Sequence, residues 1–121
     1  MARKKILVVD DTEWNRDLLV QVLEEDYEIV EAVDGEDGVK KAEQEKPDLI
    51  LMDLGMPVMD GWEATKRIKA NSELKHIPVI AVTSHAMVGD EITARDAGCD
   101  DYMAKPIDET ELIRKIKKFI G

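Results

Sequence analysis

The chain has 121 residues, enough for one hydrophobic core that needs neither disulfides nor a structural metal. Its 27 acidic and 17 basic residues give a formal net charge of −10, so its surface repels nucleic acid backbones and anionic membranes. The single cysteine, Cys99, excludes an internal disulfide and a cysteine-rich zinc site, and we interpret it as a packing residue.

The first half of the chain alternates apolar runs with amphipathic segments. A continuous apolar run predicts a strand over about 5–9, and a helix is expected over about 12–24. A less completely buried strand is predicted over about 27–33, followed by a helix over about 35–44 that Lys46-Pro47 ends. The apolar stripe of the first helix consists of Leu18, Leu19, Val22 and Leu23.

The second half continues the same alternation. Strands are predicted over 49–53, over 79–82 after Pro78, and over 102–104. The helix that ends near 71–72 places Trp62, Thr65 and Ile68 on one face, and a weakly apolar helix over about 87–97 is expected to be the least firmly held element. The last helix has an apolar face of Leu112, Ile113, Ile116, Phe119 and Ile120.

Polar residues stand at the carboxyl ends of four predicted strands. Continuous apolar runs between helices are typical of strands buried on both faces, and the repeated strand–helix order predicts a parallel α/β sheet with helices on both sides. Because parallel strands end at one edge, we expect three carboxylates, a hydroxyl and an ammonium to meet there. These groups suit a divalent metal and a phosphoryl group, and they belong to Asp10, Asp11, Asp53, Thr83 and Lys105.

Each of these residues also has a purely structural interpretation. One of Asp10 and Asp11 can complement the amino terminus of a helix, although a cap needs only one acid. Lys105 can be a solvated surface lysine, and Tyr102 a strand aromatic at the edge of the core. Trp14 and Trp62 are interpreted as packing residues.

The chain resembles the response-regulator receiver domains of bacterial two-component signalling from end to end. The resemblance rests on residue types and their order at the four strand ends. It implies a flavodoxin-like, doubly wound five-stranded parallel sheet with strand order 2-1-3-4-5, in one receiver domain over 1–121. The matching segments are Asp10-Asp11, residues 53–61, Thr83-Ser84, and Tyr102 with Lys105-Pro106.

The resemblance implies a role for each site residue. Asp53 would accept the phosphoryl group, while Asp11 and Asp53 bind Mg²⁺, or Mn²⁺, directly and Asp10 binds it through water. The backbone carbonyl of Gly55 would be a further metal ligand.

The remaining implied residues contact the phosphoryl group or transmit the signal. Lys105, the Thr83 hydroxyl and the Ser84 backbone N–H would bind phosphoryl oxygens, with the Lys105–Pro106 peptide bond in the cis form. Tyr102 would be the switch partner of Thr83 and turn into the space that Thr83 leaves. Gly55 and His85 depart from the commoner family pattern beside the path of an attacking water, which affects how long the phosphoryl group survives.

The leading hypothesis is a phosphorylation-controlled binding module that turns over no substrate of its own. It would take a phosphoryl group from a histidine kinase or a histidine phosphotransfer protein and regulate a downstream protein through its last two helices and last strand. The short apolar run after the N-terminus and the lack of a membrane-length segment lead us to expect a cytoplasmic protein, which we also expect to be a monomer.

Two other classes of function compete with this hypothesis. A Mg²⁺-dependent phosphohydrolase would use Asp53 as a nucleophile, but Gly55 stands where such an enzyme needs a general acid. A flavodoxin-like nucleotide binder would need a glycine-rich phosphate loop after the first strand, where Asp10-Asp11 would repel the ligand.

Overall fold

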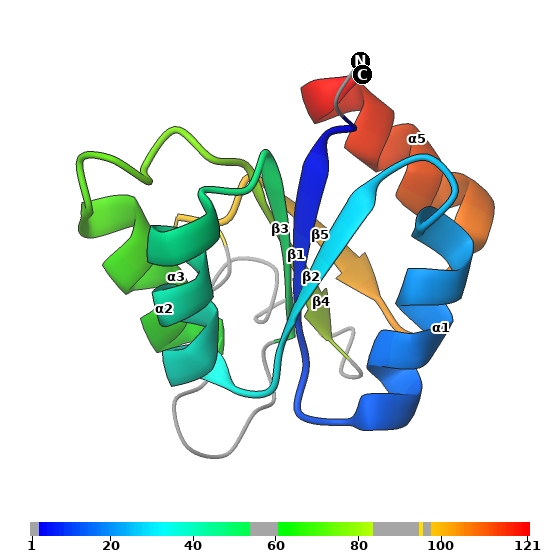
Figure 1. Cartoon of the computed structure of the whole chain (residues 1–121), viewed down its shortest axis with the longest axis horizontal. Helices are drawn as coiled ribbons and strands as arrows, with labels where there is room; N and C mark the ends of the chain where they lie inside the picture. Colours follow the sequence, from blue (N-terminus) through cyan, green and yellow to red (C-terminus); the bar gives the residue numbers. More distant parts are fainter. Residues whose placement is uncertain (1–2, 54–60, 84–94, 96–97) are drawn as a thin grey trace.

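The computed structural model describes residues 3–53, 61–83, 95 and 98–121 of the chain. The strands are β1 (Lys5–Val9), β2 (Glu28–Ala32), β3 (Leu49–Asp53), β4 (Val79–Thr83) and β5 (Asp101–Ala104). The helices labelled in Figure 1 are α1 (Glu13–Leu23), α2 (Gly35–Glu45), α3 (Gly61–Ala70) and α5 (Glu109–Ile120). Within this described part of the chain, no helix has the length and apolar character that crossing a bilayer requires.

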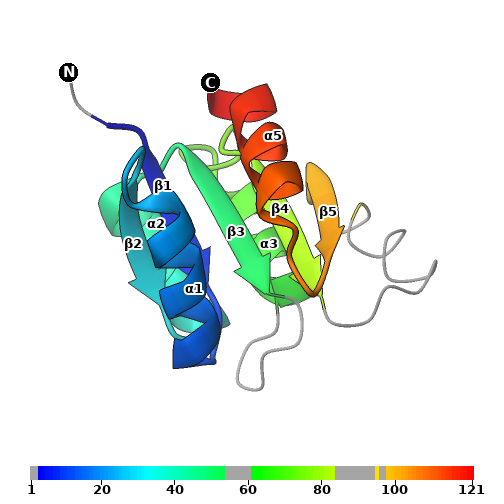
Figure 2. The same cartoon turned by 90° about the vertical axis from the view of Figure 1, so that its right-hand side faces the viewer.

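The strands form one parallel sheet, as predicted. Its order is β2-β1-β3-β4-β5, which confirms the order that the resemblance implies. Every neighbouring pair runs in the same direction, so the carboxyl ends of all five strands lie along one edge, at the bottom of Figure 2. This edge carries the polar residues that the sequence places after the apolar runs.

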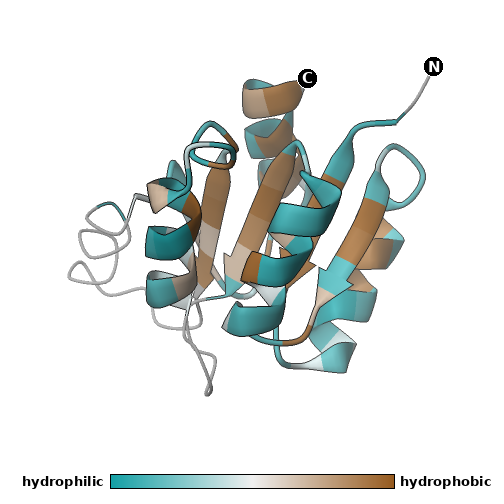
Figure 3. Ribbon diagram, turned by 60° about the vertical axis from the view of Figure 1, so that its left-hand side comes forward, coloured by the Kyte–Doolittle hydropathy of each residue, from teal (hydrophilic) through white to brown (hydrophobic). Residues whose placement is uncertain are grey.

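Helices cover both faces of the sheet. Figure 1 shows α1 and α5 on one side of the strands and α2 and α3 on the other. Alternate residues of β1 belong to the two cores, with Val8 on the α1 and α5 side and Val9 on the opposite side. Because both faces are buried, the central strands are apolar over most of their length, and they are correspondingly brown over most of their length in Figure 3.

Helix α2 packs closely against the end of β1. Its amino terminus is capped by Asp34, whose carboxylate accepts a hydrogen bond from the backbone N–H of Asp37 at 2.7 Å. A Cβ atom at Gly38 would lie 3.0 Å from the Cγ atoms of Val9, so the helix approaches this closely only because Gly38 has no side chain. This packing fixes the strand end that immediately precedes Asp10.

Two apolar residues of α1 are exposed where the sequence predicts packing. Trp14 is 69% exposed, so its interpretation as a packing residue is wrong, and Leu18 of the apolar stripe is 42% exposed. Both line a cavity beside α5. Trp62 does pack against the core, in agreement with its prediction. The helix predicted over 87–97 falls outside the described residues apart from residue 95.

Cys99 is a packing residue, as predicted. Its side chain is buried in the core on the α2 and α3 face, and its Sγ lies 3.8 Å from Thr65 Oγ1. Burial raises the pKa of the Cys99 thiol above its ordinary value. A buried thiol with a raised pKa is a poor nucleophile, which agrees with the structural interpretation.

Candidate functional site

Three carboxylates meet at the carboxyl edge of the sheet. Asp10 and Asp11 follow β1, and Asp53 is the last residue of β3, the strand beside it. One oxygen from each carboxylate lies within 4.8 Å of the other two. Asp10 is 3% exposed and Asp53 is 8% exposed, whereas Asp11 faces solvent. The structure therefore brings together the three acids that the sequence singles out.

Lys105 supplies the positive charge of the site. Its Nζ lies 3.3 Å from Asp10 Oδ2 and 3.6 Å from Asp53 Oδ2. The ammonium thus bridges acids at the ends of two different strands, and the interpretation of Lys105 as a solvated surface residue is wrong. The Lys105–Pro106 peptide bond is cis, as the resemblance implies.

Asp10 is held by the turn that leads into α1. Its Oδ1 accepts a hydrogen bond from the backbone N–H of Thr12 at 2.9 Å. The N-cap position of α1 is occupied by Thr12, whose side chain makes no capping hydrogen bond. Neither acid of the pair is therefore the cap residue, and two adjacent acids at this edge call for an explanation other than helix capping.

The three carboxylates fit a hard divalent cation. Carboxylate oxygens are the ligands that Mg²⁺ prefers, and Mg²⁺ usually takes only a few of them and completes its shell with water or substrate oxygens. Oxygens that share one Mg²⁺ stand about 3–4 Å apart, so a group spread over at most 4.8 Å needs only small side-chain shifts. The described residues at this site offer no thiolate or imidazole ligand that would favour zinc.

A cavity of about 530 Å³ opens beside the carboxylates, between α1 and the start of α5. Asp10, Asp53 and Lys105 are among its polar lining residues. Its apolar lining includes Trp14, Leu18, Leu19, Val22, Leu51 and Leu112. The buried acids are therefore reached through a recess with an apolar wall, large enough to admit part of another molecule.

The other predicted site residues are only partly described. Thr83 is the last residue of β4, and the register pairs it with Ala104, two residues after Tyr102. Positions 83 and 102 are therefore diagonal neighbours on adjacent strands. Tyr102 is partly buried and packs against the core on the α2 and α3 side. Gly55, Ser84 and His85 lie outside the described residues.

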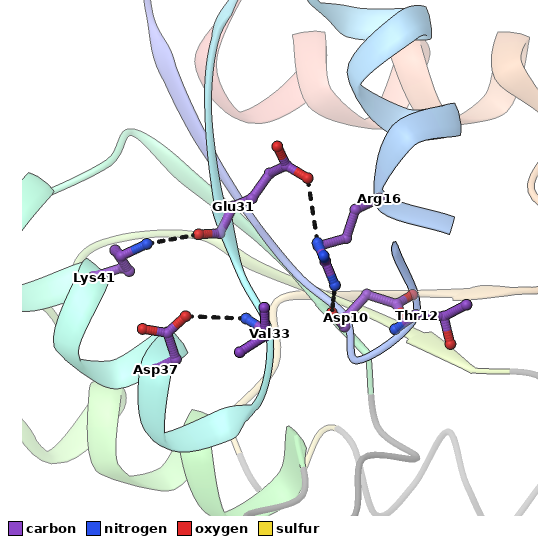
Figure 4. A network of polar contacts seen from close by, with 7 residues as sticks. All are labelled: Asp10, Thr12, Arg16, Glu31, Val33, Asp37 and Lys41. Carbon is purple, nitrogen blue, oxygen red and sulfur yellow. Dashed lines mark hydrogen bonds and ion pairs between the residues drawn. The ribbon is translucent and has the colours of Figure 1, made fainter. Parts of the chain in front are cut away.

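One residue near the acids has no role in the sequence-based predictions. Figure 4 shows Arg16 of α1 between Asp10 and Glu31, with its guanidinium directed at both. Its Nη1 donates to the backbone carbonyl of Asp10 at 2.8 Å, and its Nε donates to Glu31 Oε1 at 3.2 Å. The available signal in the sequence is an arginine one and a half turns beyond an acidic pair, which alone specifies no partner.

The clustered carboxylates predict that Asp11→Asn stabilises the metal-free protein. Two charges 4.8 Å apart repel by about 3 kcal/mol at an effective dielectric constant of 20, and solvent around the exposed Asp11 reduces this to about 1 kcal/mol. We expect the free energy of unfolding in urea to rise by about 1 kcal/mol without Mg²⁺. Mg²⁺ should then stabilise the wild type more than the variant.

Glu25→Gln is the matched control, since Glu25 is an exposed acid in the turn before β2, at the opposite end of the sheet. It should change neither the stability nor the response to Mg²⁺ by more than a few tenths of a kcal/mol. A metal-free Asp11→Asn protein less stable than the wild type would contradict the repulsion between the acids.

Known proteins are similar to this chain in both sequence and fold. The model of the response regulator receiver domain family matches residues 6–117. A polar-differentiation response regulator DivK from Brucella anthropi is 42% identical over 119 residues, which cover 98% of this chain and 97% of that protein. The DivK protein of Brucella ovis is likewise 42% identical with the same coverage.

Solved structures agree with this relationship. The receiver domain of sensor histidine kinase PA1611 from Pseudomonas aeruginosa, solved with a magnesium ion coordinated in its active site cleft, matches with a TM-score of 0.92 and 37% identity over 99% of both chains. The chemotaxis protein CheY4 of Vibrio cholerae matches with a TM-score of 0.92 and 28% identity over 98% of this chain and 99% of that one. The chain therefore belongs to the response regulator receiver domain family and is a response regulator of phosphorelay signalling.

Proposed function

We propose that Asp53 accepts a phosphoryl group from a phosphohistidine on a histidine kinase or a histidine phosphotransfer protein. The observation that carries this proposal is the position of the Asp53 carboxylate, 8% exposed at the end of β3 and 3.6 Å from the Lys105 ammonium. The chain acts as a single receiver domain over 1–121, as a monomer in the cytoplasm, and serves as a switch with no substrate turnover of its own.

In the proposed reaction, a carboxylate oxygen of Asp53 attacks the phosphorus atom, the bond from phosphorus to the histidine nitrogen breaks, and that nitrogen keeps the electron pair. A carboxylate is a poor nucleophile toward a phosphoryl group because both are negative. Lys105 lowers this barrier by donating to the phosphoryl oxygens, for which its Nζ turns from Asp10 and Asp53 toward the incoming group. The site itself promotes the transfer, and slow hydrolysis of the acyl phosphate resets it.

Mg²⁺ would be held by Asp11 and Asp53 directly, by Asp10 through water, and by the carbonyl of Gly55, which lies outside the described residues. When bound, it supplies the positive charge that offsets both the carboxylates and the phosphoryl oxygens. Mn²⁺ offers the same hard-ligand chemistry and should substitute for it. The burial of Asp10 and Asp53 keeps their oxygens in place for this purpose.

The same proposal extends to the signal. The Thr83 hydroxyl and the Ser84 backbone N–H donate to the phosphoryl oxygens, and Tyr102 responds to the changed position of Thr83. The diagonal register of positions 83 and 102 on β4 and β5 supports this route. The altered surface, formed by the last two helices and β5, then recruits or releases a downstream protein. A ligand shifts such an equilibrium only through its differential affinity for the two states.

Acetyl phosphate distinguishes the proposed switch from a phosphohydrolase. With Mg²⁺ present, we expect intact-mass spectrometry to find one phosphoryl adduct per chain, labile to hydroxylamine as an acyl phosphate is. Phosphate release beyond the slow decay of this adduct should be absent, because the sequence places Gly55 where a hydrolase needs a general acid. Rapid, repeated release of phosphate without a measurable adduct would favour the hydrolase instead.

A further inference from the structure

Arg16 connects four elements of the fold at the acidic edge. From α1 its guanidinium reaches the end of β1, at the carbonyl of Asp10, and the side chain of Glu31 on β2. The backbone carbonyl of Glu31 in turn accepts a hydrogen bond from Lys41 Nζ of α2 at 2.9 Å. Figure 4 shows this continuous path from α2 through β2 and Arg16 to Asp10. The Arg16 side chain is only 12% exposed and its contact with the Asp10 carbonyl is partly buried, whereas the Glu31 side chain is 42% exposed.

The contact with Asp10 acts on the peptide that joins the two acids of the pair. The Asp10 carbonyl, which Arg16 holds at 2.8 Å, belongs to the Asp10–Asp11 peptide group. The other side of Asp10 is fixed by its backbone N–H, which donates to the Ala32 carbonyl at 3.1 Å. Because a peptide group is planar, fixing its carbonyl also fixes the plane from which the Asp11 residue projects. Arg16 therefore restricts both acids without touching either carboxylate in the contacts described.

Glu31 balances the charge of this contact. Its Oε1 lies 3.2 Å from Arg16 Nε, so the arginine charge is paired on the side away from Asp10. A planar guanidinium donates in two fixed directions at once, whereas the lysine ammonium is a single point charge. The bridge between a backbone carbonyl and a carboxylate on a neighbouring strand thus depends on arginine geometry as well as on charge.

We propose that Arg16 is a positioning residue for Mg²⁺ binding, which it supports by fixing the Asp10–Asp11 peptide. This inference rests on the proposed function, in which these acids hold the metal. Residues that orient metal ligands from outside the ligand shell typically contribute tenfold to a hundredfold to metal affinity.

The loss of the Arg16 positive charge alone would have the opposite effect on Mg²⁺ affinity. Removing a cation from the neighbourhood of a Mg²⁺ site lowers the electrostatic repulsion of the ion, so Arg16→Met should then bind Mg²⁺ more tightly. If Arg16 positions the acids, the same variant binds Mg²⁺ more weakly, because the pair no longer stands in the binding geometry. The direction of the change in affinity therefore separates the two explanations.

The test is a calorimetric titration of MgCl₂ into the full unphosphorylated chain. Arg16→Met should raise the dissociation constant for Mg²⁺ about tenfold or more relative to the wild type. Arg16→Lys keeps the charge but cannot bridge both acceptors, so its dissociation constant should lie between the two. Arg67→Met is the matched control, since Arg67 pairs with Glu63 on the exposed side of α3, and its affinity should stay within about twofold of the wild type.

Unfolding in urea with EDTA accompanies each titration, so that a general loss of stability is measured separately from affinity. An Arg16→Met protein that is folded and binds Mg²⁺ as tightly as the wild type, or more tightly, overturns the proposal. If Arg16→Met does not fold, Arg16→Lys decides the matter, and a wild-type affinity in that variant overturns the proposal as well. A wild type that binds no Mg²⁺ contradicts the proposed metal site itself, which is a different and recognisable failure.

Discussion

Asp53→Asn is expected to abolish the phosphoryl adduct completely while the domain remains folded. Asparagine has nearly the same shape as aspartate, but its amide oxygen does not attack phosphorus to form a stable acyl phosphate. The change also removes one of three clustered negative charges, so the free energy of unfolding without metal should not fall by more than about 1 kcal/mol. Intact-mass spectrometry after incubation with acetyl phosphate and Mg²⁺ measures the loss.

Asp17→Asn provides the control for this experiment, because Asp17 is an exposed acid on α1. It should be phosphorylated at the wild-type rate and to the same extent. The wild type in EDTA should behave like Asp53→Asn, since three carboxylates repel a phosphate anion when no divalent cation offsets them. Labelling that survives in Asp53→Asn, or that is equally strong in EDTA, contradicts the assignment.

Lys105→Met is expected to slow phosphoryl transfer by about a hundredfold to a thousandfold, the usual cost of removing one preorganised donor to a developing charge. It should also destabilise the metal-free protein by about 1–3 kcal/mol, because Asp10 and Asp53 lose the ammonium that lies 3.3 and 3.6 Å from their oxygens. This destabilisation is smaller than the cost of breaking a fully buried ion pair, because the Lys105 side chain is 23% exposed. Stopped-flow labelling and urea unfolding give the two values.

The effect of Lys105→Met on stability has the opposite sign to that of Asp11→Asn. The two variants change the net charge of the same cluster in opposite directions. Mg²⁺ should recover much of the stability that Lys105→Met loses. Lys117→Met, an exposed lysine on α5, is the matched control and should leave both rate and stability unchanged. A Lys105→Met protein that is phosphorylated as fast as the wild type would exclude Lys105 from the transfer step.

Much of the fold was predictable because burial on both faces leaves a strong signature. Continuous apolar runs such as 49–52 are typical of central parallel strands, and each observed strand lies within two residues of its predicted range. The order of strands in the sheet has no such signature, since hydrophobic runs do not specify which strand lies beside which. That order came from the family resemblance, and the sheet confirms it.

The acidic cluster was predictable for a topological reason. Asp10 and Asp53 follow apolar runs, and parallel strands bring their carboxyl ends to one edge whatever the order of the strands. The errors have physical causes too. Helical periodicity predicts which face of α1 is apolar but not how far the neighbouring elements extend over it, so Leu18 and Trp14 are exposed at the cavity.

The role of Arg16 could not be predicted from the sequence, because its partners are the backbone carbonyl of Asp10 and the side chain of Glu31 on β2. Sequence spacing relates residues within one helix or one strand, and it carries no information on contacts with main-chain oxygens of a neighbouring element. Only the packing of α1 against β1 and β2 brings Arg16 to Asp10 and Glu31.

The most direct test of Asp53 as the phosphoryl acceptor locates the acyl phosphate in the chain. Protein treated with acetyl phosphate and Mg²⁺ is reduced with borohydride, which converts an aspartyl phosphate to homoserine, and is then digested and sequenced by tandem mass spectrometry. We expect homoserine at position 53 alone, and only in samples that contained both the phosphoryl donor and Mg²⁺. Homoserine at position 10 or 11, or a phosphoryl adduct on another residue with Asp53 unmodified, would contradict the assignment of Asp53 as the acceptor.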